Sequence, residues 1–127
     1  MHPLAVGAAI VAAVIHVWFF VLESVRFMRP AVWRRFGLGS ETEAAVVRSF
    51  AFNQGFYNLF LAIGVGLGLG LAATGDGPSG RAIVLFACGS MIAAGVVLVA
   101  HNRAFARAAL VQAVPPLLAV AGILLLG

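Results

Sequence analysis

The sequence predicts an all-α integral membrane protein built as a four-helix bundle. Three observations indicate this fold class: apolar residues make up 63% of the 127 residues, charged residues make up only 9%, and four long apolar stretches are separated by short polar connections. A water-soluble domain is about half apolar and about one quarter charged, because it must cover its surface with polar groups. The mean hydropathy of +1.09 agrees with lipid as the solvent and excludes a disordered chain.

Each apolar stretch is long enough to cross a hydrocarbon core of about 30 Å as a helix, which takes about 20 residues. The runs are continuous and do not alternate with polar residues, which favours helices over the strands of a barrel. No basic segment precedes the first run, so we expect a retained helix and not a signal peptide. The predicted spans of this single domain, in up-down-up-down order, are residues 4–27, 44–71, 82–100 and 108–127.

The connections between the spans predict the orientation. Seven of the eight arginines flank the first and third connections, and only Arg81 belongs to the second. By the positive-inside rule the arginine-rich side faces the cytoplasm, which puts both termini on the outer side of a bacterial inner membrane. Anionic lipids are the expected partners of these arginines. At the start of the second span we expect Ser40 to cap the helix, with Glu41 and Glu43 in its first turn.

Two other compositional features exclude common functions. The net charge of +4 does not indicate nucleic-acid binding, because the basic residues are spread over connections and not gathered on one folded face. The single cysteine, Cys88, lies in an apolar run with no metal-ligand spacing around it. We therefore predict a buried packing residue and no metal site.

Glycines and prolines in two spans carry predictions about packing. Residues 64–70 contain two small-xxx-small pairs, Gly64 with Gly68 and Gly66 with Gly70. Small residues let helices approach closely in lipid, so this segment is a candidate for helix packing and for a homo-oligomer contact. In the fourth span, two consecutive prolines at 115 and 116 remove two backbone amides, and we expect a break there that widens the bundle interior.

Polar side chains inside a membrane are costly, so their positions indicate where function lies. With a rise of about 1.5 Å per residue, they fall into two layers in the arginine-rich, cytoplasmic half of the bundle. We predict that these layers enclose a polar pocket, while the alternative is that the amides only join helices, at about 0.6 kcal/mol for each hydrogen bond. The shallow layer contains Glu23, Asn53, Gln54 and Gln112, and the deeper layer contains His16, Tyr57 and Asn58.

Short motifs along nearly the whole chain resemble those of one known family. The most specific is Asn53-Gln-Gly-Phe-Tyr-Asn58, and it is accompanied by Leu22-Glu23, Phe36-Gly37 and Val111-Gln112 with the prolines that follow. Together they resemble a family of small bacterial four-helix membrane proteins known only as domain of unknown function 1304. Residues 92–97 depart from the family pattern, which carries a tyrosine after the glycine. The resemblance implies a four-helix membrane protein with no assigned activity, and it points to the same residues as the depth estimate: Glu23, Asn53, Gln54, Tyr57, Asn58 and Gln112.

The favoured function is binding of a small amphiphilic or apolar ligand in the pocket. Glu23 is the expected ionisable group, and the side chains of Gln54, Tyr57 and Asn58 are expected to orient the ligand through hydrogen bonds. A second hypothesis is a proton-coupled exporter that uses Glu23, by architectural analogy with small multidrug transporters. The one-sided arginines disfavour the inverted pairs that those transporters form.

Two further hypotheses stay open. One is a membrane enzyme of isomerase or lipid-modifying type, with Glu23 and His16 as the candidate acid–base pair. The other is a non-catalytic assembly subunit in which the polar layer only sets the register of the helices. No cofactor is predicted, although the sequence leaves haem binding through His16 open.

Overall fold

The computed structural model describes all 127 residues, and it contains helices and no strand. The predicted all-α class is confirmed, because four helical segments are long and apolar enough to cross a membrane. Each segment covers most of one predicted span, and the differences are confined to the ends. The segments are Pro3–Val25, Glu41–Ala73, Gly77–His101 and Arg103–Leu126.

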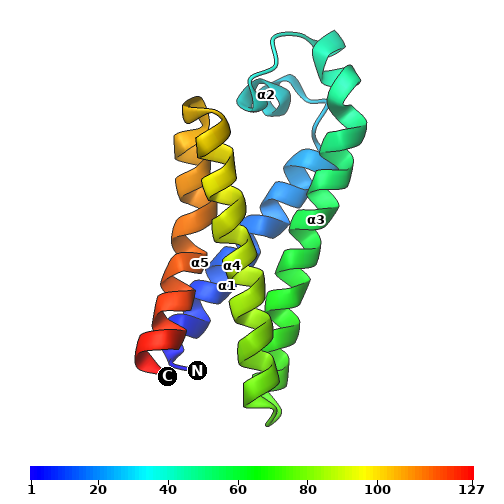
Figure 1. Cartoon of the computed structure of the whole chain (residues 1–127). Helices are drawn as coiled ribbons and strands as arrows, with labels where there is room; N and C mark the ends of the chain where they lie inside the picture. The colour runs from blue at the N-terminus through cyan, green and yellow to red at the C-terminus, as the bar shows by residue number, and fades with distance from the viewer. The chain divides into compact units, whose positions relative to one another are not determined.

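The chain contains α-helices, one π-helix and short 3₁₀-helices. It divides into two compact units, residues 16–60 and the remainder. We call residues 16–60 the Glu23 unit and residues 1–15 with 61–127 the hairpin unit. The elements in Figure 1 are α1 (Pro3–Phe20), the π-helix η1 (Val21–Val25), α2 (Pro30–Trp33), the 3₁₀-helix η2 (Arg34–Phe36), α3 (Glu41–Ala73), α4 (Gly77–His101), the 3₁₀-helix η3 (Arg103–Phe105) and α5 (Ala106–Leu126).

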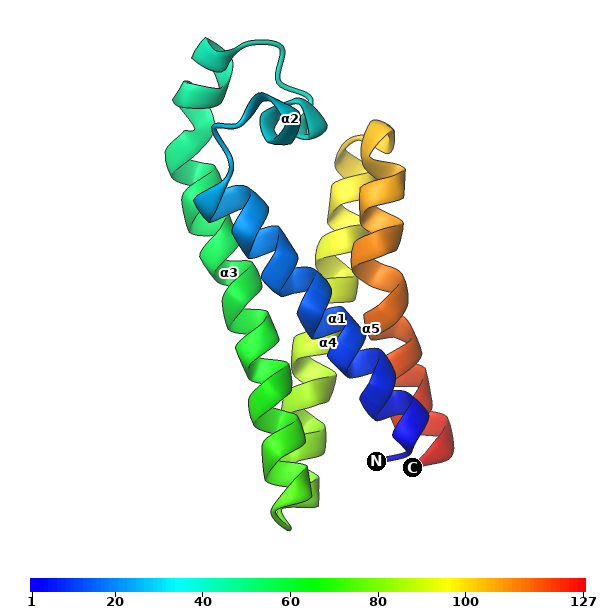
Figure 2. The ribbon, with the colours of Figure 1, turned by 180° about the vertical axis from the view of Figure 1, so that it is seen from behind.

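Small side chains form the core of the hairpin unit. Helices α4 and α5 run antiparallel side by side, and the start of α1 lies near the end of α5 (Figure 2). Helix α1 contributes Ala5, Ala9 and Ala12, which share one helix face and are all buried. A Cβ atom at Gly122 of α5 would lie 2.8 Å from the Cβ of Ala5, so these helices approach as closely as small residues allow.

The glycine segment of α3 is divided between two environments. A Cβ atom at Gly68 would lie 2.7 Å from Cγ2 of Val84 and 2.8 Å from the carbonyl oxygen of Gly80, so this position packs tightly on α4. Gly66 and Gly70 have no neighbouring atom within 4 Å of such a Cβ. Part of the predicted close packing is therefore made inside the hairpin unit, whereas the homo-oligomer contact stays a prediction.

The predicted break at the two prolines is wrong. Helix α5 continues without interruption through Pro115 and Pro116. Pro116 is fully buried, so the packing of its ring offsets the backbone hydrogen bonds that the prolines remove. Gln112, one turn earlier, donates its side-chain amide to the carbonyl oxygen of Met91 on α4 at 3.4 Å, which ties α5 to α4 at this level.

The Glu23 unit has its own apolar core beneath the first connection. Leu22, Phe27, Val32, Trp33 and Ala44 are its buried members. Proline stands at the start of α2, where its missing amide costs no helical hydrogen bond. A glycine at position 37 ends η2 with φ of 79°, a left-handed conformation that glycine adopts without strain. The connection is therefore a folded cap and not an extended loop.

The start of α3 confirms the predicted helix cap. The amide of Glu43 donates to Oγ of Ser40 at 3.2 Å, and the amide of Gly39 donates to Oε2 of Glu43 at 2.7 Å. The bond to Ser40 satisfies a backbone amide that the first turn leaves without a helical partner, and the bond to Glu43 satisfies the amide just before the cap residue. Glu41 and Glu43 thus belong to the helix start, as the sequence indicated.

Candidate functional site

Glu23 lies in the π-helix that ends the first span. The amide of Arg26 donates to the carbonyl of Val21, five residues earlier, at 2.9 Å. Such turns interrupt the α-helical register and occur frequently at functional sites. The sequence predicts one regular helix over residues 4–27, so this local change in register is a finding of the structure.

A hydrogen bond joins Glu23 to α3. The side-chain amide of Asn58 donates to Oε2 of Glu23 at 2.8 Å, and Asn58 is only 6% exposed. A buried amide without a partner would cost about 1–3 kcal/mol, so this bond stabilises the pairing of the two helices. The depth estimate placed the two residues in different layers because it measured depth from assumed helix ends, whereas the first segment ends at Val25 and α3 already begins at Glu41.

Close backbone contact fixes the position of Glu23 along α3. Oγ of Ser24 donates to the carbonyl oxygen of Phe52 at 2.7 Å. Gly55 is buried beneath Ser24, and a Cβ atom there would lie 3.0 Å from both Cβ and the backbone nitrogen of Ser24 and would collide with its Oγ. Because only glycine leaves room for this approach, the carboxyl group next to Ser24 is held at a defined point on α3.

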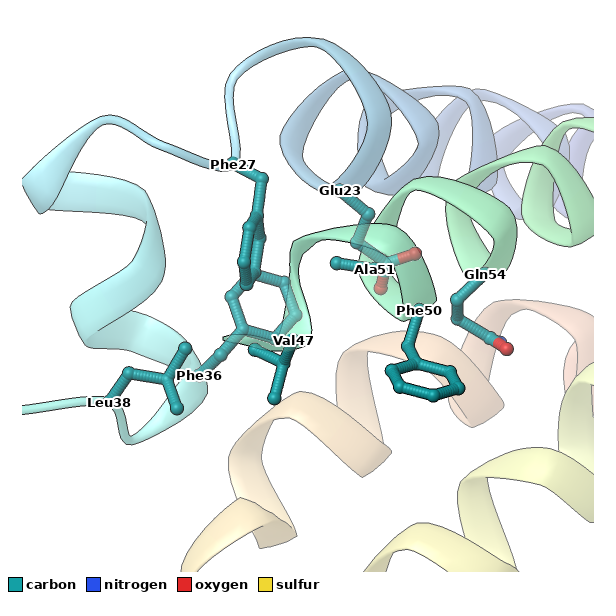
Figure 3. A pocket seen from close by; sticks show the side chains of 8 residues that line it. All are labelled: Glu23, Phe27, Phe36, Leu38, Val47, Phe50, Ala51 and Gln54. Atoms are coloured by element: carbon teal, nitrogen blue, oxygen red, sulfur yellow. The ribbon is translucent and has the colours of Figure 1, made fainter. Parts of the chain in front are cut away.

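A cavity of about 430 Å³ lies beside this carboxyl group, and we call it the Glu23 pocket (Figure 3). Ligand sites in proteins typically have volumes of about 300–1,000 Å³. The rings of Phe27 and Phe36 pack edge to face at 5.5 Å along one side, and Phe50 and Gln54 project from α3. The lining residues are Glu23, Phe27, Phe36, Leu38, Val47, Phe50, Ala51 and Gln54.

A second cavity of about 50 Å³ shares Glu23 and Phe27 with the Glu23 pocket. Its wall also includes Ser24 and Arg48, so it is the more polar of the two. The guanidinium of Arg48 makes no ion pair with Glu23 within 4.0 Å. Glu23 therefore lines both cavities. Its carboxyl group accepts one hydrogen bond from the rest of the protein, from the side chain of Asn58.

The predicted polar stripe of α3 is split by the structure. Asn58 is buried and donates a hydrogen bond to Glu23, and Gln54 lines the Glu23 pocket. Asn53 is exposed and lines neither cavity, and Tyr57 is 58% exposed with no hydrogen bond from its hydroxyl. The structure thus brings together Glu23, Gln54 and Asn58 and turns the other two side chains outward.

The remaining predicted site residues lie apart from these cavities' walls. His16 is fully buried, with its ring edge-on to Phe19 at 5.4 Å, and it lines neither cavity. Gln112 belongs to the hairpin unit, where its amide binds the Met91 carbonyl. No three histidine, cysteine or acidic side chains come together in an arrangement that would hold a metal ion.

The apolar wall of the pocket is not predicted by the sequence. Phe36 and Leu38 belong to the basic connection, and Val47, Phe50 and Ala51 belong to the first turns of α3. The apolar side chains of Phe36 and Leu38, in a connection that also contains arginines and glycines, were the available signal. On helices, by contrast, apolar residues are too common in this chain to distinguish a pocket wall from a lipid-facing surface.

The family comparison agrees with the motifs in the sequence. The model of a family described as protein of unknown function (DUF1304) matches residues 10–124, which is nearly the entire chain. No curated protein and no solved structure shows significant similarity to this chain. The matched range contains all residues that line the two cavities, and it contains Glu23 and Asn58, which form the hydrogen bond. It also contains all four predicted spans except their outermost residues.

Proposed function

The chain belongs to the DUF1304 family, which has no assigned function, and we propose that it binds a small amphiphilic molecule in the Glu23 pocket. The composition of the pocket wall carries this proposal. Six of its eight lining side chains are apolar, and the two polar ones are Glu23 and Gln54. A wall of this kind suits a molecule with an apolar body and one hydrogen-bonding end, because the apolar side chains provide contact area and the two polar side chains offer hydrogen bonds.

The place of the pocket along the helices supports an amphiphilic ligand. Glu23 lies in the last turn of the first span, and Arg48 is the last charged residue of α3. Helix α3 has 33 residues and is therefore about 50 Å long, which exceeds a hydrocarbon core of about 30 Å. Its charged first turns extend past the core, so the pocket lies at the membrane boundary, where a molecule with one polar end is best solvated.

We place the arginine-rich connections at the cytoplasmic face of a bacterial inner membrane, on the basis of the positive-inside rule. The ligand then enters from the cytoplasmic leaflet, where anionic lipids surround the arginines. Both cavities are formed by residues between Glu23 and Gln54, which favours binding over passage across the bilayer. The acid–base hypothesis has no comparable support, because His16 lines neither cavity.

A titration with 1-dodecanol tests the proposal. We expect the purified protein in nonionic detergent to bind it saturably, as measured by native mass spectrometry, and Phe50→Ala to weaken binding about fivefold through lost van der Waals contact. Phe86→Ala is the matched control. Phe86 is 76% exposed, close to the 78% of Phe50, but it lines neither cavity. Equal weakening by both substitutions would show general adsorption to apolar surface and contradict the proposal.

A further inference from the structure

We infer that the polar end of the ligand is a cationic amine and that Glu23 is the group that recognises it. This inference rests on the proposed function and adds the chemical class of the ligand. Lipid tails are as apolar as the pocket wall, so contact with the apolar body of a ligand does not by itself distinguish that ligand from lipid. Selectivity must therefore come from the polar end and from the groups that meet it.

The carboxyl group of Glu23 retains capacity to accept hydrogen bonds. Oε2 accepts one bond, from Asn58, and no other side chain bonds to this carboxyl group. An ionised carboxylate offers about four acceptor positions and no donor, so the group that fills them must itself donate. A protonated amine has up to three N–H donors and the opposite charge, which gives a charge-assisted hydrogen bond.

The rest of the pocket wall favours a cation over an anion. Glu23 is the sole charged residue among the eight that line the pocket, and no lysine, arginine or histidine is present to pair with a carboxylate or phosphate head. The rings of Phe27, Phe36 and Phe50 attract a cation placed over their faces, and this attraction increases when water is excluded. The side-chain amide of Gln54 can donate or accept a hydrogen bond, so it favours neither a cationic nor an anionic ligand.

Arginines of the Glu23 unit would compete with an amine for the carboxyl group of Glu23. Arg48 shares the smaller cavity with Glu23, and Arg26 follows the π-helix as an exposed side chain. Neither guanidinium lies within the 4.0 Å that an ion pair requires. Arg48 is thus the main internal competitor, and its removal is expected to strengthen the binding of an amine.

Three probes with the same twelve-carbon tail separate these possibilities: dodecylamine, 1-dodecanol and dodecanoate. In nonionic detergent at neutral pH, we expect the wild-type protein to bind the amine about tenfold more tightly than the alcohol and to bind dodecanoate most weakly. Glu23→Gln is expected to reduce amine affinity to about that of the alcohol, and a thermal unfolding transition close to that of the wild type shows that the variant is folded. Glu41→Gln removes the same charge from an exposed position outside the pocket and is expected to keep the amine preference.

Arg48→Gln gives an independent readout, with amine affinity expected to rise about threefold. Arg107→Gln in the hairpin unit is its control and is expected to have no effect. An amine preference that survives Glu23→Gln would overturn the inference. Saturable alcohol binding without any amine preference would also overturn it, yet leave the proposed function standing, whereas failure of all three probes to bind would end both.

Discussion

The substitution Ala51→Phe is expected to weaken 1-dodecanol binding about thirtyfold or more, which corresponds to about 2 kcal/mol. Ala51 is a half-buried residue of α3 that lines the Glu23 pocket between Val47 and Gln54. A phenyl ring at this position points into a cavity of about 430 Å³ and occupies the space that the ligand needs. Binding measured by native mass spectrometry and by the ligand-dependent shift in Tm reports the loss.

Ala45→Phe is the matched control for this experiment. Ala45 is exposed on the same helix and lines neither cavity, so the added ring leaves the pocket open. We expect wild-type affinity for this variant. If Ala51→Phe also bound 1-dodecanol with wild-type affinity while remaining folded, the ligand would have to sit elsewhere on the molecule.

The substitution Gly55→Ala is expected to lower the free energy of unfolding by about 3 kcal/mol, the upper part of the range for overpacking. The new Cβ would meet the backbone nitrogen, Cβ and Oγ of Ser24 together, so a change of one side-chain rotamer does not relieve the contact. The helices must separate, which breaks the hydrogen bond from Ser24 to the Phe52 carbonyl. Titration with sodium dodecyl sulfate in mixed micelles measures the change.

Gly66→Ala provides the comparison on the same helix. No atom lies within 4 Å of a Cβ atom at Gly66, and alanine favours a helix over glycine by about 1 kcal/mol. This variant is therefore expected to be as stable as the wild type or slightly more stable. Equal destabilisation by the two substitutions would mean that backbone flexibility, and not contact with Ser24, explains the need for glycine at position 55.

The sequence was sufficient for the fold class because hydropathy and length determine which helices can cross a membrane. The helix ends differ because helices continue past their apolar runs: α3 begins at Glu41, whose charge suits a first turn, and α4 begins at Gly77 after the cap from Asp76. The π-helix at residues 21–25 was beyond sequence reasoning. Its hydrogen-bond register depends on how the end of the first span packs on α3, and no local pattern in Val21–Val25 encodes that contact.

The candidate site was predictable only in its polar part. The cost of burying polar groups in lipid singled out Glu23, Gln54 and Asn58, which the structure places together. The same reasoning also selected Tyr57, which is exposed, because periodicity along one helix does not reveal which face a neighbouring helix covers. The apolar wall was not predictable, since side chains such as that of Val47 are indistinguishable in sequence from those that face lipid.

The most direct test of the central claim is to map where an amphiphile contacts the protein. A 1-dodecanol derivative with a diazirine in its tail is bound to the wild-type protein, activated by light, and located by mass spectrometry of peptides. The Glu23 pocket predicts that labels concentrate in residues 27–38 and 47–54 and that excess unlabelled 1-dodecanol removes them. Labels spread evenly along the lipid-facing helices, and unaffected by the competitor, would contradict the assignment of the binding site.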